Sequence, residues 1–225
     1  MAMDALWATI TAMPMHDADL LTLTQWLSPS YPVGAFAWSH GLESAIGRGT
    51  VTTPADLSEW LHDVLTVGAG RSDAILLCAA YDSDDPADLA ELAAALSPSR
   101  ERRMETLQQG AAFAAVTRDV WGLDLAEMAY PVAVGRAAKM RNLPVLPVAQ
   151  VWLQSFASNL AQAALRLMPL GQTAAARIIA DLTPAILKTA TEAQSATLDD
   201  LGTAAVAVDI AAMQHVNLPS RIFRS

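Results

Sequence analysis

The sequence has very little cysteine and lysine. Cys78 is the single cysteine among 225 residues, so neither an intrachain disulfide nor a cysteine-based zinc site can form. It lies in an apolar stretch, which is typical of a buried hydrophobic side chain rather than of a nucleophile. Lysine occurs only at Lys139 and Lys188, and the formal net charge is -9. Nucleic acid is therefore not an expected partner, because binding it requires clustered cations that neutralise phosphates.

Charged residues are also scarce, at 16% of the chain against 53% hydrophobic residues. No uninterrupted apolar run reaches the roughly 18 residues of a membrane span. The N-terminal region carries Asp4, Asp17 and Asp19 rather than the cations of a secretory leader. We expect a cytoplasmic protein that does not bind a membrane. Ordinary globular chains have roughly 25% charged residues, so the apolar excess favours self-association as a homodimer.

Signatures of catalysis and of metal binding are missing as well. There is no GxxxxGK[ST] phosphate loop, so hydrolysis of GTP or ATP by that route is not expected. The four histidines are His16, His40, His62 and His215. None pairs with another at helical spacing, so no helical two-histidine metal site is expected. The pairs His40–Glu43 and Glu59–His62 fit a weak metal contact or a surface hydrogen bond, and we favour the hydrogen bond. We expect neither enzyme activity nor a cofactor.

Apolar residues recur at helical spacing along almost the whole chain, and helix-start signals such as Thr53-Pro54 with Asp56 punctuate it. The sequence predicts an all-α, single-domain bundle of about ten helices. The predicted helices are residues 18–28, 37–46, 54–69, 71–82, 86–96, 99–121, 128–141, 147–168, 172–193 and 198–214. Pro184 should kink or split the ninth of these helices. Residues 1–16 are predicted to be a flexible extension, 17–215 the helical domain and 216–225 a docking tail.

Two helical stretches carry informative charges. The run from Arg100 to Arg103, interrupted by Glu101, is typical of a solvated helix face. The helix at 147–168 should lie in the middle of the bundle, because Arg166 is the only formal charge between Val148 and Met168. Its polar side chains form one stripe, which is either an internal hydrogen-bonded seam or the lining of a wet cavity or an interface. The stripe consists of Ser155, Asn159, Gln162 and Arg166.

The segment from Leu27 to Glu43 interrupts the helical pattern. Its prolines favour extended backbone, and Phe36, Trp38 and His40 then follow on a short predicted helix. These large side chains either plug the core or form a rigid platform that binds another protein.

The C-terminal hexapeptide 220–225 follows Pro219 and places two arginines around Ile222 and Phe223. The segment is too short to bury these two apolar side chains by itself. We therefore expect it to be mobile in the isolated chain and to become ordered when a partner supplies a groove.

Three stretches carry a resemblance to a known family. They are Pro32-Val33-Gly34 with Phe36 and Ser39-His40-Gly41-Leu42-Glu43; Arg166-Leu167-Met168-Pro169-Leu170-Gly171-Gln172; and Met213-Gln214-His215 with Ser220-Arg221-Ile222-Phe223-Arg224-Ser225. In order and spacing, over about residues 20–225, they are similar to the motifs of UreF-type urease accessory proteins. The resemblance implies an all-helical, non-catalytic homodimer. It also implies binding to the accessory protein UreD (also called UreH) and to the GTPase UreG, in a complex that delivers nickel to apo-urease.

The same resemblance implies the partner-binding residues. They are Tyr31, Pro32, Gly34, Phe36, Ser39, Gly41, Glu43, Arg221, Ile222, Phe223 and Arg224. In the family, the aromatic after the Pro-Val-Gly turn and the tail arginine help to organise the assembly, and they correspond here to Phe36 and Arg221. Some relatives have Tyr at the position of Phe36, so a packing role is favoured here. Two alternatives are a helical cytoplasmic enzyme that uses scattered carboxylates and His40, and a purely structural bundle.

Overall fold

The computed structural model describes residues 15–225, and these residues form helices without any β-strand. The predicted all-α class is confirmed. The elements are α1 (Asp17–Trp26), η1 (Ala35–Ala37), α2 (Leu42–Gly47), α3 (Pro54–Thr66), α4 (Ala69–Asp82), α5 (Ala87–Ala95), α6 (Arg100–Trp121), α7 (Tyr130–Met140), α8 (Val145–Leu167), α9 (Gln172–Asp181), α10 (Thr183–Ser195), η2 (Leu198–Asp200), α11 (Val206–Gln214) and η3 (His215–Asn217). The predicted N-terminal extension lies almost entirely outside the described residues.

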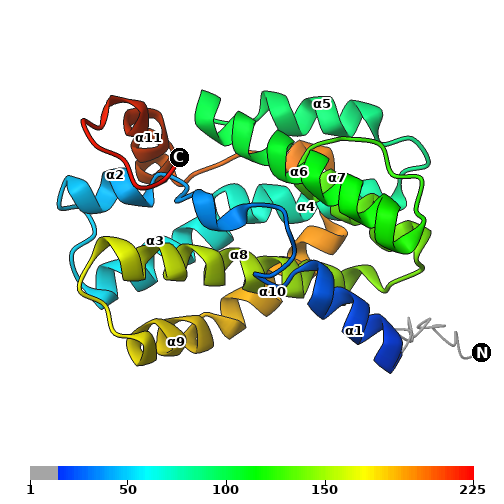
Figure 1. Cartoon of the computed structure of the whole chain (residues 1–225), viewed down its shortest axis with the longest axis horizontal. Helices are drawn as coiled ribbons and strands as arrows, with labels where there is room; N and C mark the ends of the chain where they lie inside the picture. Colours follow the sequence, from blue (N-terminus) through cyan, green and yellow to red (C-terminus); the bar gives the residue numbers. More distant parts are fainter. Residues whose placement is uncertain (1–14) are drawn as a thin grey trace, which may run out of the picture.

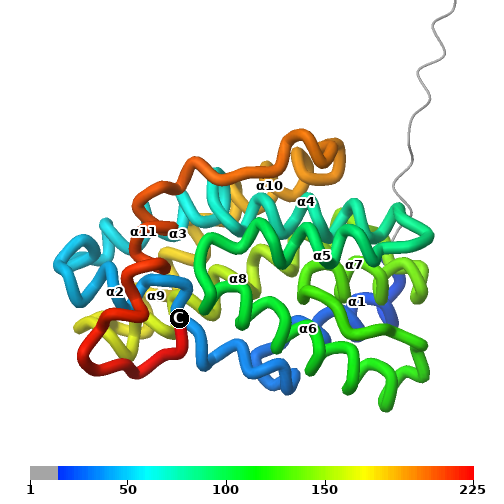
Figure 2. Tube along the Cα trace, turned by 90° about the horizontal axis from the view of Figure 1, so that it is seen from above, coloured from blue at the N-terminus to red at the C-terminus, as the bar shows by residue number. Residues whose placement is uncertain are grey.

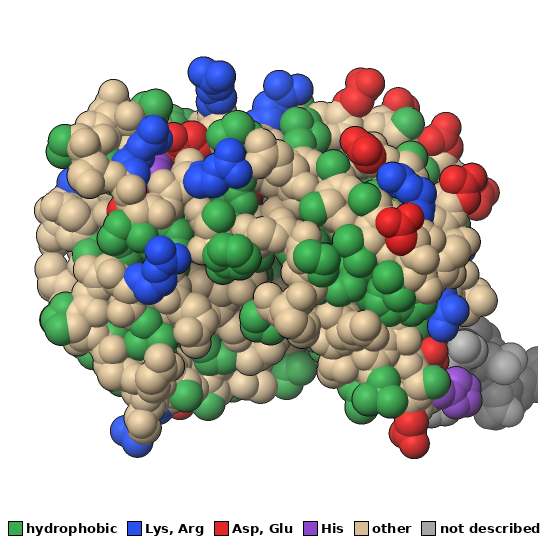
Figure 3. Space-filling model, viewed as in Figure 1, with side chains coloured by type: hydrophobic (Ala, Val, Ile, Leu, Met, Phe, Trp, Pro, Cys, Tyr) green, Lys and Arg blue, Asp and Glu red, His purple; other side chains and the backbone are tan. Residues whose placement is uncertain are grey.

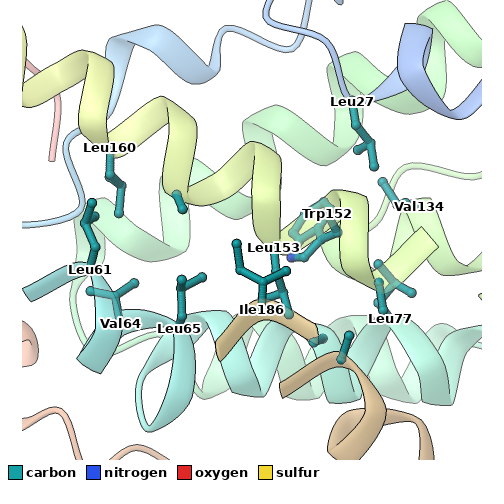
Figure 4. Packing of buried hydrophobic residues seen from close by; sticks show 14 of the residues in the cluster. Leu27, Leu61, Val64, Leu65, Leu77, Val134, Trp152, Leu153, Leu160 and Ile186 are labelled. Atoms are coloured by element: carbon teal, nitrogen blue, oxygen red, sulfur yellow. The ribbon is translucent and has the colours of Figure 1, made fainter. Parts of the chain in front are cut away.

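Helix α8 lies in the middle of the bundle, as its composition predicts. In Figure 1 it crosses the centre of the molecule, with α5, α6 and α7 along one edge and α9 along the opposite edge. Its apolar side chains Trp152, Leu153 and Leu160 are buried and face neighbouring helices (Figure 4). Full burial of one such side chain contributes roughly 1.5–3 kcal/mol, so this central layer supplies much of the stability of the fold.

Helices α3 and α4 together span Pro54–Asp82, which by length and composition alone is long and apolar enough to cross a membrane. In the bundle, 56% of the most apolar window of this stretch is buried, as is usual for core helices. Cys78 lies in α4 and is buried, in agreement with the sequence analysis, and burial raises the pKa of its thiol to about 12.

Most of the predicted helices are present within a few residues, and Pro184 does separate two helices, α9 and α10. Two predictions were wrong in part. The helix predicted at 37–46 begins only at Leu42, because His40 and Gly41 both adopt positive φ angles, of 55° and 79°. The helix predicted at 198–214 is interrupted after η2, where the amide of Ala204 donates to the Val67 carbonyl instead of to a helical partner (2.8 Å).

The start of α3 lies where the helix-start signals of the sequence predict it, and a capping box holds it. The amide of Asp56 donates to Thr53 Oγ1 (3.2 Å), and the amide of Thr53 donates to Asp56 Oδ2 (2.8 Å). The amide and hydroxyl of Thr52 donate to the same carboxylate oxygen, each at 2.9 Å. These bonds, with the Thr52 amide first, lower the pKa of Asp56 from 3.8 to about 2.

We therefore expect Asp56 to titrate at about pH 2 in a carboxyl NMR titration. Because its folded pKa lies below the unfolded value, its contribution to stability is present above that value and disappears as the pH falls towards 2. The Thr52→Ala variant removes one donor and should raise the pKa towards 3.8. An unshifted pKa in the wild-type protein would contradict the capping geometry.

Candidate functional site

The segment before α2 places its aromatic side chains on opposite sides of the backbone. Tyr31 is buried and its hydroxyl lies 2.9 Å from Thr117 Oγ1, and Trp38 is also buried. Phe36, in contrast, is 72% exposed on η1, which follows a turn at Gly34 with φ 73°. Each of the two interpretations therefore holds for different residues. Tyr31 and Trp38 fill the core, whereas Phe36 and Pro32 are exposed.

The C-terminal tail packs against this segment. The amide of Arg224 donates to the Ala37 carbonyl, and the amide of Ser39 donates to the Ser225 carbonyl, both at 2.9 Å. The Ser39 hydroxyl also donates to the Ser225 carbonyl. Figures 1 and 2 show the end of the chain beside the segment that leads into α2. The two stretches that carry the sequence motifs are therefore in direct contact.

Glu43 connects α2 to the tail. Its Oε1 accepts a hydrogen bond from the amide of Ile222 (2.6 Å), and its Oε2 accepts one from the amide of Phe223 (3.0 Å). The Nε2 atom of His215 lies 2.9 Å from the same Oε2. Burial alone would raise the pKa of Glu43, but the Ile222 amide, His215 and the Phe223 amide outweigh burial and hold the pKa below its usual value.

His215 is completely buried between two carboxylates. Its Nδ1 lies 2.7 Å from Glu101 Oε2, opposite the contact of its Nε2 with Glu43. Both ring nitrogens must donate to satisfy both carboxylates, and only the imidazolium form does so. Arg221 of the tail also donates to Glu101, at 2.6 Å.

A second ion pair, Arg102–Glu105, is buried beside these groups, and the Ser225 hydroxyl donates to Glu105 (3.1 Å). We call the whole set the buried ionic cluster. It consists of the carboxylates Glu43, Glu101 and Glu105 and the cations Arg102, His215 and Arg221. Three carboxylates thus face three cations. Arg221 lies at the exposed edge of the cluster, with 41% of its side chain accessible, and the pairing explains how the other five charged groups are buried.

Three expectations are corrected by this geometry. The solvated face expected at 100–103 was wrong for Glu101 and Arg102, because both side chains point into the cluster and are buried. His40 forms no surface hydrogen bond with Glu43. Its imidazole is buried and packs edge-on against Phe156, and burial, together with the charge of Arg102, lowers the pKa of His40 well below its usual value. The third correction concerns the hydrogen bond expected between Glu59 and His62. His62 Nδ1 instead lies 3.8 Å from Asp63 Oδ1.

The expectation that the tail is mobile in the isolated chain was also wrong. Phe223 is 4% exposed and Ser225 is buried within the chain itself. The error came from the assumption that only a partner can supply acceptors for the tail amides, whereas Glu43 supplies two of them. Whether residues 216–225 also dock onto a partner stays a prediction.

Gly41 permits the close approach between α2 and α11. A Cβ atom at this position would lie 2.6 Å from the backbone nitrogen of Ala212, closer than non-bonded atoms approach. The absence of a side chain at Gly41 therefore brings Glu43 within reach of His215, which lies at the end of α11.

A cationic and apolar surface remains exposed where the C-terminal tail meets the segment before α2. Ile222 is 56% exposed, and Arg221, Arg224 and Arg166 are exposed near it. The Arg166 guanidinium lies over the buried Phe223 ring, 4.4 Å from its centroid. With Phe36 we call these residues the cationic face. Figure 3 shows Lys and Arg gathered on the half of the molecule that carries the C-terminus, whereas Asp and Glu gather at the other end.

A second exposed surface was missed by the sequence analysis. Four large apolar side chains follow α11 and η3 at helical spacing and are about half exposed or more: Val206, Ile210, Met213 and Val216. We call them the α11 stripe. The opposite side of α11 buries Val208, Ala211 and Ala212. A helix that is apolar on both sides usually has a partner on each, so the composition of α11 could have indicated this surface.

The polar stripe of α8 divides between the interior and the surface. Ser155 donates to the Leu27 carbonyl (2.7 Å) and, with Asn159, lines a cavity of about 40 Å³, which is large enough for about three water molecules. Gln162 and Arg166 are exposed. Asp73 lines the same cavity, and burial raises its pKa to about 7. Among residues 15–225 no group of three or more His, Cys, Asp or Glu side chains is arranged to hold a metal ion.

Comparisons with known proteins agree on one family. A family model described as UreF matches residues 51–183. The chain is 50% identical to a protein of Cereibacter sphaeroides named urease accessory protein UreF, over 92% of this chain and 99% of that protein. Proteins of the same name from Roseobacter denitrificans and Bradyrhizobium diazoefficiens are 46% and 43% identical, over 91% and 92% of this chain and 93% and 92% of their own.

Proposed function

Because this chain belongs to the UreF family of urease accessory proteins, we propose that it acts in urease maturation as an adaptor. In this role it joins an accessory protein of the UreD/UreH type and the GTPase UreG to apo-urease, in the cytoplasm, while nickel is inserted as the cargo. The chain is an accessory protein and not a catalytic enzyme, as its relatives are named. The alternative enzyme centred on His40 is dropped, since that imidazole is buried against Phe156.

One observation carries the proposal: the segment that leads into α2 and the C-terminal tail meet at the buried ionic cluster and leave the cationic face exposed. A purely structural bundle has no need to expose Phe36 and Ile222 beside three arginines on a protein of net charge -9. Aromatic and arginine side chains are the residues that most often dominate binding energy at protein interfaces. An acidic partner surface with an apolar pocket is the complement that this face requires.

The α11 stripe supports a second contact. It is apolar and adjoins the tail, so it suits either the UreD/UreH-type partner or a second copy of this chain in a homodimer. Exposed apolar patches of this kind are interaction sites more often than the rest of a protein surface is. Its position next to the cationic face allows both contacts to be made at the same time, which is what an adaptor requires.

We expect Phe36→Ala to weaken binding of the purified accessory partners by about tenfold or more, as for an aromatic anchor residue. Urease activation in cells that lack their own UreF should fall accordingly. The fold should be retained, because the side chain is 72% exposed. Binding can be measured by calorimetry with the UreD/UreH-type partner and UreG, alone and together.

The matched control is Leu187→Ala, which removes an exposed apolar side chain from α10 on another part of the surface. It should leave binding and activation unchanged. If Phe36→Ala binds its partners with wild-type affinity, the cationic face is not the binding site. If the wild-type chain fails to restore urease activation, the adaptor function itself is refuted.

A further inference from the structure

The tail residues alternate between the surface and the interior. Ile222 and Arg224 are exposed, whereas Phe223 and Ser225 are buried. The backbone bends at Ile222 and Phe223, and in this bend Ile222 faces outward and Phe223 faces inward. A change of the bend would alter which of these two side chains a partner meets.

Few contacts hold the tail in this conformation. Backbone hydrogen bonds join the tail to Ala37 and Ser39 only at its far end, through Arg224 and Ser225. At the middle of the tail, the amides of Ile222 and Phe223 both donate to one side chain, Glu43. Successive groups of an extended segment point to opposite sides, so both amides reach one carboxylate only while the backbone bends at Ile222 and Phe223.

We propose that Glu43 is a positioning residue that holds this bend of the C-terminal tail and so determines which tail side chains a partner meets. The proposal rests on the proposed adaptor function and deepens it. Glu43 itself touches no partner in this scheme, since it is buried. It acts through Ile222 and Arg224, which its two hydrogen bonds hold on the outer side of the tail.

The Glu43 carboxylate is itself held in place from the other side. His215 donates to its Oε2 and is fixed in turn by Glu101 on α6. Arg221, the tail residue before Ile222, also donates a hydrogen bond to Glu101, so Glu101 binds both His215 and the tail. The charged groups around Glu43 thus include His215 beyond α11, Glu101, Arg102 and Glu105 on α6, and Arg221 in the tail.

This arrangement makes the tail pre-organised for binding. A tail that is ordered before the encounter does not lose its conformational freedom on association, so the affinity for the partner is higher than for a mobile tail of the same sequence. Loss of the bend, with the cluster otherwise intact, should reduce affinity without removing a single contacting side chain.

The test uses Glu43→Gln in the full chain, because the amide is of the same size and can still form a hydrogen bond with a neutral His215. It lacks one of the two acceptor oxygens. We expect hydrogen exchange of the Ile222 and Phe223 amides to accelerate by about tenfold or more, as for loss of bonds to a charged acceptor. Affinity for the UreD/UreH-type partner or UreG should fall by a similar factor. Glu59→Gln, which removes an exposed carboxylate on α3, is the control and should change neither quantity.

A pH profile separates positioning from a merely structural role. The folded pKa of Glu43 lies below 4.5, so the two amide hydrogen bonds are present above that pH and are lost as the pH falls through the lower value. The NMR shifts of both tail amides should follow this titration in the wild-type protein and lose it in Glu43→Gln.

Two outcomes overturn the inference. One is unchanged exchange of the tail amides in Glu43→Gln, and the other is accelerated exchange with wild-type partner affinity. Deletion of residues 220–225 distinguishes this failure from failure of the proposed function. If the deletion abolishes binding while Glu43→Gln does not, only the positioning role is refuted. If a folded deletion variant binds normally, the tail has no place in the adaptor function.

Discussion

His215→Ala should lower the free energy of unfolding at pH 7 by about 3–5 kcal/mol, the usual cost of removing one partner from a buried ion pair. The imidazolium lies between Glu43 and Glu101, at 2.9 and 2.7 Å, and is fully buried. Its removal leaves two carboxylates facing a small void, with Arg221 as the remaining cation for Glu101. Urea denaturation followed by circular dichroism measures the loss.

The effect of His215→Ala should depend on pH in a defined direction. In the wild-type protein the pKa of Glu43 is below 4.5, so its stabilising contribution is lost as the pH falls through that lower value. In the variant the folded pKa of Glu43 rises, because His215 no longer helps the tail amides to offset burial, so the variant loses less stability than the wild type on acidification. The difference between the two proteins should therefore shrink on acidification. A difference that stays constant from pH 7 to below the folded pKa of Glu43 would show that lost packing, and not charge, is responsible.

The control for this prediction is His62→Ala. This histidine is exposed on α3 and lies 3.8 Å from Asp63 across a solvated pair. Surface ion pairs of this kind contribute about 0–1 kcal/mol, so this variant should stay near wild-type stability at all pH values. An equal loss in both variants would mean that the cluster has no special role.

Gly135→Ala should lower the unfolding free energy by about 3 kcal/mol, at the upper end of the range for overpacked cores. The glycine lies on α7 where that helix crosses α4, and an added Cβ would overlap the Leu77 carbonyl oxygen and approach Ala80 Cβ to 3.2 Å. The obstacle is helix backbone, so no side-chain rotation relieves it and the two helices must move apart. For a chain of this length, the melting temperature should fall by about 6–12 °C.

Gly47→Ala is the matched control, because no atom lies within 4 Å of a Cβ built there and the residue ends α2. This substitution should be neutral or stabilise by up to about 1 kcal/mol, since alanine restricts the unfolded chain more than glycine does. Thermal unfolding of the three proteins side by side measures both effects. Equal melting temperatures for Gly135→Ala and the wild type would show that the close packing of α4 and α7 is not required.

The sequence by itself determined the helices. Apolar spacing and capping residues placed α3, α6 and α8 within a few residues of their observed bounds, and Pro184 marked the junction of α9 and α10. These signals are local, since a capping box or a proline acts within one helical turn. The breaks at His40 and before α11 were not predictable in the same way, because a positive φ angle and the bond from Ala204 to Val67 are stabilised by residues far away in the sequence.

The motifs at residues 32–43 and 213–225 indicated the family and the segments of the candidate site, but not whether their side chains are buried or exposed. Sequence pattern assigned Arg102 and Glu101 to solvent, as is usual for charged side chains. Only the tertiary structure brought them together with Glu43, His215 and Arg221, whose partners lie more than 100 positions apart along the chain. A buried charge is tolerated only when an opposite charge meets it, and that meeting is a property of the fold, not of any local stretch of sequence.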